Sequence, residues 1–134
     1  MATWNKFQSW AENMVEVANL GSDQFVIALT NSAPIATNSV LADLTQISYT
    51  NLSSRNLTTA SSSQTGGTYA LTFNDLVLTA SGAVATFRYV VVYDDTPTSP
   101  ADPLVGWWDY GSTITMANGE TFTIDFTGAA ITLS

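Results

Sequence analysis

The chain has 134 residues, of which 11 are acidic and three are basic, a net charge of −8 and no cysteine. This negative charge repels the phosphate backbone of nucleic acids and anionic membrane surfaces, so we expect neither as a partner. Without cysteine the chain forms no disulfide, thiol nucleophile or thiolate metal site. Its length suits one domain with a sizeable core, and we expect a single domain over residues 1–134.

The N-terminal residues place apolar side chains at the spacing of a helix. Intervals of three and four residues separate most of them, and Gly21 follows as a helix stop. We therefore predict an amphipathic helix over residues 4–20, within a helical arm of residues 1–21. Two interpretations stay open: the helix packs on the side of a sheet, or it docks on a neighbouring subunit. The candidate interface residues are Trp4, Phe7, Trp10 and Met14.

The clearest strands lie at residues 84–93 and 104–110. Both carry apolar side chains on their two faces, which is typical of central strands covered on both sides. Between them, residues 94–103 hold three of the four prolines and three acids. Because proline lacks the N–H group that a paired strand donates, we predict a loop there that joins two paired strands.

Shorter apolar alternations predict further strands at residues 25–29, 69–73, 76–78, 113–116, 121–126 and 131–133. Asn118-Gly119 is a strong hairpin pattern. Residues 40–47 indicate a short helical turn, and the Ser- and Thr-rich residues 58–68 indicate a mobile loop or a weak edge strand. These strands after one helix predict a mainly β fold: an antiparallel β-sandwich or jelly-roll-like domain, with its β core over residues 22–134.

Arg88 stands in the middle of a predicted central strand, on a face that is otherwise apolar. A charge in that position needs a carboxylate partner or an interface, because an unpaired buried charge is strongly destabilising. Asp109 lies on the strand expected to pair with it. We therefore predict a structural ion pair between Arg88 and Asp109, with a subunit contact as the alternative.

Groups for catalysis are few, because the chain has neither histidine nor cysteine. Four acids near the central loop are the candidates for a glycosidase-type carboxylate pair or a Ca²⁺ site: Asp94, Asp95, Asp102 and Asp109. Their spacing matches no calcium loop, and an acidic rim in contact with solvent is the simpler interpretation. We therefore predict a non-enzymatic protein without a catalytic, metal or cofactor site.

Aromatic side chains crowd the second central strand, where Trp107, Trp108 and Tyr110 lie close together in sequence. Aromatic residues at strand spacing usually belong to a core. A sugar-stacking platform built on the two tryptophans stays open, and with it a carbohydrate-binding module as an alternative function.

A series of short packing and turn stretches runs along nearly the whole chain. NLGSD ends the first predicted helix, QFVIALTNSAP, VLADLTQI and LTFNDLVLTASG come next, and FRYVVVYDD, a proline-containing loop, LVGWWDYG and NGETFTIDF complete the series. In this order they resemble a group of small virion structural proteins of tailed bacteriophages. The resemblance covers nearly the whole chain and rests on packing and turn residues, without an active-site motif.

The resemblance implies a capsid decoration, or cement, protein that binds the major capsid protein on the outside of the head, commonly as a homotrimer. Such a protein is made in the host bacterial cytoplasm and ends on the capsid exterior of the virion. An acidic chain with only 10% charged residues suits the outside of a DNA-filled shell and contacts within an assembly. A tail or adsorption component is the alternative within the virion.

Overall fold

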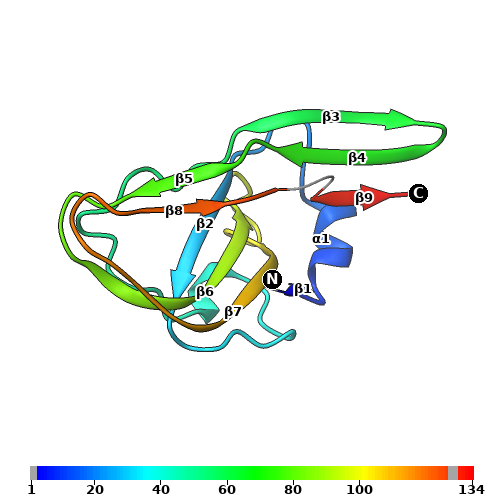
Figure 1. The fold of residues 1–134 in the computed structure, drawn as a ribbon. Helices are drawn as coiled ribbons and strands as arrows, with labels where there is room; N and C mark the ends of the chain where they lie inside the picture. The colour runs from blue at the N-terminus through cyan, green and yellow to red at the C-terminus, as the bar shows by residue number, and fades with distance from the viewer. Residues whose placement is uncertain (1–2, 127–129) are drawn as a thin grey trace.

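The structure consists mainly of β-strands in antiparallel sheets, with one short α-helix in the described part of the chain (Figure 1). It is a computed structural model and describes residues 3–126 and 130–134. The elements are β1 (Thr3–Lys6), α1 (Trp10–Glu16), β2 (Phe25–Thr30), the 3-10 turn η1 (Leu41–Asp43), β3 (Thr59–Thr65), β4 (Thr68–Phe73), β5 (Leu76–Thr79), β6 (Val84–Asp94), β7 (Leu104–Met116), β8 (Thr121–Ile124) and β9 (Ile131–Leu133). The strands form a four-stranded sheet, β1-β7-β6-β2, a three-stranded sheet, β3-β4-β9, and a pair, β5-β8. The prediction of a mainly β chain is confirmed.

β6 and β7 form the centre of the four-stranded sheet, as the sequence predicts. They pair antiparallel across the proline-rich loop, with Val91 opposite Trp107 and Val92 opposite Gly106. Val90 and Val92 face one hydrophobic core, whereas Val91 faces another. Successive side chains of a strand point to opposite faces, so the two cores lie on the two sides of this sheet.

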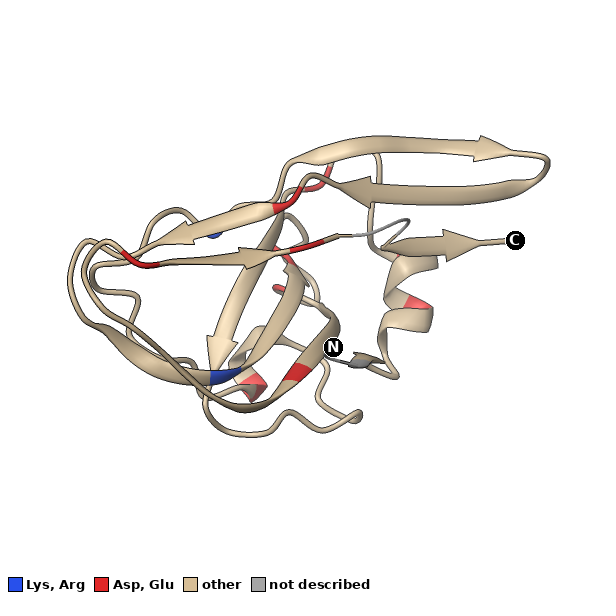
Figure 2. Cartoon of the chain, viewed as in Figure 1, with Lys and Arg blue, Asp and Glu red and all other residues tan. Residues whose placement is uncertain are grey.

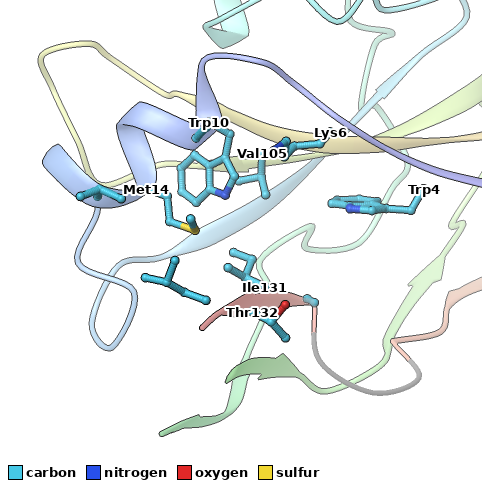
Figure 3. Close-up of a pocket in the computed structure, with 11 residues that line it drawn as sticks. Trp4, Lys6, Trp10, Met14, Val105, Ile131 and Thr132 are labelled. Carbon is cyan, nitrogen blue, oxygen red and sulfur yellow. The ribbon is translucent and has the colours of Figure 1, made fainter. Parts of the chain in front are cut away.

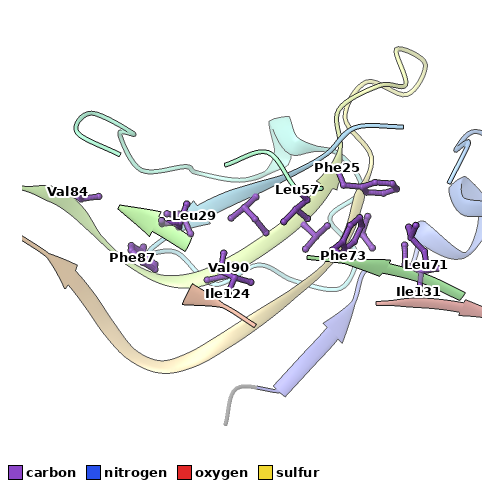
Figure 4. Packing of buried hydrophobic residues seen from close by; sticks show 14 of the residues in the cluster. Phe25, Leu29, Leu57, Leu71, Phe73, Val84, Phe87, Val90, Ile124 and Ile131 are labelled. Carbon is purple, nitrogen blue, oxygen red and sulfur yellow. The ribbon is translucent and has the colours of Figure 1, made fainter. Parts of the chain in front are cut away.

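The main core lies between the four-stranded sheet and the two smaller sheets (Figure 4). Because the strands of the smaller sheets also alternate, each contributes one apolar side to this core and exposes the other. The buried residues that meet here include Phe25, Ile27, Leu29, Leu71, Phe73, Leu78, Phe87, Val90, Ile124 and Ile131. Each fully buried aliphatic or aromatic side chain contributes roughly 1.5–3 kcal/mol, so this core dominates the stability of the fold.

The second core covers the opposite face of the four-stranded sheet. Its buried members are Phe7, Val26, Ala28, Val91, Tyr93 and Leu104. Leu41 and Leu44, at the ends of η1, pack against these residues and hold the long segment after β2 on the sheet. The short helical turn predicted in this segment is therefore present as η1, and it gives the central strands their second cover.

The helix predicted over residues 4–20 is wrong at both ends, because residues 4–9 and 17–20 are not helical. Thr3–Lys6 form β1, which pairs with the free edge of β7 and places Lys6 opposite Gly106. Helix α1 runs only over Trp10–Glu16. Residues of β1 gain strand hydrogen bonds that a short, isolated helical turn cannot match. The proposed helical arm of residues 1–21 is therefore a strand followed by two helical turns.

The Asn118-Gly119 prediction is right about the turn and wrong about the pairing. Gly119 adopts a φ of +86°, which favours glycine, and the chain does reverse there. The strand after the turn, β8, pairs with β5 and not with β7. The turn thus carries the chain from one sheet to another.

Of the two interpretations of residues 58–68, the edge strand is the one found, as β3.

Candidate functional site

A groove lies between α1, β1 and β9, where the N-terminal segment meets the C-terminal strand (Figure 3). Its volume is about 410 Å³. The side chains that matter for its chemistry are Trp4, Lys6, Trp10, Met14, Ile131 and Leu133. Both flanking strands are at sheet edges, because β1 ends the four-stranded sheet and β9 ends the three-stranded sheet. The groove is therefore apolar and bordered by strand edges.

Trp4 holds its place in the groove through the strand beneath it. Its ring packs against Trp108 with the ring centroids 4.6 Å apart. It also lies over Gly106, where a β-carbon would stand only 2.3 Å from Cζ2 of Trp4. Glycine at position 106 thus leaves the space that the indole fills.

Trp10 closes the inner side of the groove. Its side chain is only 2% exposed, and its Nε1 has no hydrogen-bond acceptor among the described residues. In Figure 3 the indole nitrogen lies on the side of the ring that faces Ile131 across the groove. A buried donor without an acceptor costs roughly 1–3 kcal/mol, and this N–H lies too deep for a partner in the groove to reach it.

The rim of the groove is unusually apolar and carries one cation. Three of the large apolar side chains that remain well exposed in the described chain border it: Trp4 at 36%, Val15 at 68% and Leu133 at 48%. Clustered exposed apolar groups of this kind mark interaction sites. Lys6 forms no ion pair within the described residues, whereas Arg88 is paired and Arg55 stacks on Tyr49. The groove therefore presents apolar surface and, within the described residues, one positive charge without an ion-pair partner.

Three of the four predicted interface residues line this groove, and one does not. Trp4, Trp10 and Met14 meet there. Phe7 is fully buried on the other face of the sheet, packed against Trp107 with ring centroids 4.5 Å apart. Within this group Trp4 and Met14 keep accessible surface, whereas Phe7 and Trp10 are used inside the chain. Sequence reasoning missed Lys6 and the whole contribution of β9.

Arg88 and Asp109 form the predicted pair. Nε of Arg88 donates to Oδ1 of Asp109 over 2.8 Å, and Nη2 donates to Oδ2 over 3.1 Å. Both side chains are more than a third exposed, so this is a bidentate pair at the surface and not the buried pair that the sequence indicates. Oδ1 of Asp109 also accepts the N–H of Gly111, where β7 bulges away from β6. The pair thus fixes the bulge.

Replacing Arg88 with methionine should raise the pKa of Asp109. The hydrogen bond from Arg88 and then that from the Gly111 amide hold this pKa below its ordinary value. A depressed folded-state pKa stabilises the fold above about pH 3.9, and the contribution is lost as pH falls through the folded pKa. Carboxyl NMR titration measures the shift. Lys6→Met is the control, because it removes a cation outside the pair; an Asp109 pKa unchanged by R88M would contradict the assignment.

The acids of the central loop do not converge on a metal site. No group of three or more potential ligands that could hold a metal ion occurs among residues 3–126 and 130–134.

Asp94 differs from the other acids of this loop in its burial. It is completely buried at the end of β6, and its Oδ2 has no donor in the described chain. Burial, and then the neighbouring carboxyl of Asp23, raise the pKa of Asp94 to about 8.

The two tryptophans proposed as a sugar platform lie on opposite faces of β7. Trp107 packs against Phe7, next to the second core. Trp108 packs against Trp4 and Phe126, next to the main core. Stacking of one sugar on both rings needs them on one surface, so this pair does not form such a platform.

No family model matches the chain, and the searches of curated proteins and of solved structures also found no match. Among the described residues, no helix has the length and apolar character that a bilayer crossing requires.

Proposed function

We propose that this chain is a non-enzymatic structural protein of a tailed-phage virion, and that it acts as a capsid decoration protein. The resemblance in the sequence supplies the context. The observation that carries the proposal is the groove between α1 and β9, with its exposed apolar rim. We further interpret the packing of the four-stranded sheet against the two smaller sheets as a β-sandwich of jelly-roll-like type.

The proposed occupant of the groove is a segment of the major capsid protein. That segment would offer apolar side chains to the exposed rim residues Trp4, Val15 and Leu133. A carboxylate on it would meet Lys6 at the rim. The exposed rim side chains and Lys6 have no such partner within the described residues, and together they define a partner that is apolar and carries a negative charge.

Binding of this kind reinforces a shell by mass action. A copy that binds neighbouring capsomers in the assembled lattice stabilises that lattice and opposes the outward pressure of packaged DNA. The chain's net charge of −8 suits the capsid exterior, because DNA fills the interior. The proposal includes synthesis in the host bacterial cytoplasm and assembly as a homotrimer at local threefold positions.

Co-sedimentation with empty capsids of the same phage tests this proposal. The wild-type chain should pellet at a fixed ratio to the major capsid protein. Carboxylates placed on the rim by V15D with L133D should lower the affinity at least about tenfold, which corresponds to about 1.4 kcal/mol. V77D is the matched control, since Val77 is also exposed, at 50%, but does not line the groove.

Two outcomes would overturn the proposal in different ways. If the wild-type chain stays in the supernatant, the capsid is not its partner, and binding to phage tails and to host glycans is measured next. If the wild-type chain and the rim variant pellet equally, the capsid is the partner but the groove is not the contact.

A further inference from the structure

The hairpin of β3 and β4 projects beyond the rest of the molecule, with β3 on its outer side (Figure 1). In the described chain, β4 is the only strand that pairs with β3. All of β3 except Thr59 is exposed. One edge of this strand therefore presents its backbone N–H and C=O groups to solvent along several residues.

This edge lacks the usual protection against pairing. Natural edge strands are commonly guarded by lysine, proline or an inward-pointing charge. β3 reads TASSSQT and contains none of these, and its one irregularity lies at its base, between Thr59 and Ser61. The stretch from Ser61 to Thr65 is a regular strand with unguarded hydrogen-bonding groups.

The same hairpin is the uncharged part of an acidic molecule. No charged residue occurs between Arg55 and Asp75, and Figure 2 shows the hairpin without an acidic or a basic segment. Two copies with a net charge of −8 repel one another wherever their acids approach. An approach along the outer edge of this hairpin brings uncharged strand against uncharged strand, and salt screens charges beyond roughly 8 Å.

The edge is also ordered before any partner arrives. Gly66 and Gly67 adopt φ values of +58° and +87°, the geometry of a tight two-residue hairpin turn. Side-chain hydrogen bonds tie the strands together, from Ser61 to Thr72 over 2.7 Å and from Ser62 to Tyr69 over 2.8 Å. Little conformational entropy is therefore lost when this edge pairs.

We propose that β3 pairs with β3 of a second copy of this chain, antiparallel about a two-fold axis near Ser63. Ser63 is the middle residue of the regular stretch Ser61–Thr65, so an antiparallel pair centred there aligns the two strands side by side over this whole stretch. The two three-stranded sheets become one continuous six-stranded sheet. A two-fold contact is closed, so it buries both free edges without leading to a filament.

This inference is independent of the proposed function. The contact uses β3, whereas the groove uses α1, β1 and β9. It also applies to a trimer, because two trimers can meet across a two-fold axis through their projecting hairpins. A single strand pair buries less area than a standard interface, so we expect a weak association that depends on protein concentration.

Charge variants at position 63 test the pairing. Light scattering and sedimentation equilibrium are run from about 10 μM to about 1 mM, the range in which weak contacts are populated. At the upper end, the wild-type mass should be twice that of S63K and twice that of S63D, because each variant places like charges across the axis. An equimolar mixture of S63K and S63D should recover the doubled mass. Ser63 makes no side-chain hydrogen bond within the described chain, so both variants should fold.

T68K is the matched control, because it adds the same charge to the same hairpin on the inner strand β4. It should keep the wild-type mass. Equal masses for the wild type and both position-63 variants at every concentration would overturn the pairing. A doubled mass that T68K abolishes as fully as S63K, or that the mixture does not restore, would also overturn it, since either result places the contact elsewhere. None of these results depends on capsid binding.

Discussion

Replacing Asp94 with asparagine should stabilise the folded chain at pH 8 and flatten its dependence on pH. Asp94 is completely buried, and burial followed by the nearby Asp23 carboxyl raises its pKa to about 8. A carboxyl whose folded pKa lies above its unfolded value is stabilising when protonated. Its contribution is complete below the unfolded pKa, near 3.9, and is lost as pH rises toward the folded pKa.

The magnitude follows from proton linkage. One group that stays protonated only in the folded state lowers the unfolding free energy by up to about 1.4 kcal/mol for each pH unit. This fall in the unfolding free energy with rising pH should appear between about pH 4 and pH 8. The raised pKa of Asp102 acts in the same direction, whereas the lowered pKa values of Asp43 and Asp109 act only at the acidic end. Asparagine keeps an acceptor for the Thr96 amide and supplies an N–H donor at every pH.

Urea unfolding at unit steps of pH measures the effect. The wild-type chain should lose stability from pH 5 to pH 8, and D94N should lose much less. E12Q is the control, because Glu12 is exposed on α1 and its replacement removes the same formal charge. A slope that E12Q reduces as much as D94N would point to overall charge repulsion and would exclude Asp94 as the source.

The sequence predicts the centre of this fold well because burial there is decided by local alternation. In β6, Val90, Val91 and Val92 are apolar on both faces, and a strand of that kind must be covered twice. The structure of the N-terminal segment is harder to predict, because intervals of three residues between apolar side chains suit a helix, whereas Trp4 and Lys6 also suit a strand. The segment becomes a strand because it pairs with the edge of β7, and local sequence does not show that this edge is free.

The candidate site was predictable only in part, for a related reason. Trp4, Trp10 and Met14 were found as apolar residues close together in sequence, and they do meet. Their counterparts on β9 lie more than one hundred residues away, and only pairing of β9 with β4 brings them near. The Arg88 partner was found because Asp109 lies on the next strand. The surface position of this ion pair was not predicted, because it depends on the β7 bulge at Gly111, which adopts a φ of +79°.

Replacing Gly106 with alanine should destabilise the chain and displace Trp4 from the groove. The added β-carbon would lie 2.3 Å from Cζ2 of Trp4 and 2.6 Å from the carbonyl oxygen of Asn5. Two neighbours therefore have to shift, and one of them is backbone. Forced overpacking of this kind typically costs about 1–3 kcal/mol, and the backbone contact places this case toward the upper end. Urea unfolding measures the loss, and a change in tryptophan emission reports the indole that moves.

A double variant separates the two clashes. W4A with G106A removes the contact with the ring and keeps the contact with Asn5, so it should cost less than the sum of the single changes. G21A is the control, because its β-carbon would meet only ordinary contacts at 3.6 Å and beyond, so the change in stability should stay within about 1 kcal/mol. If G106A were as stable as the wild type, Trp4 would be free to swing off the sheet. The groove would then lack a fixed wall, and a partner would have to form it on binding.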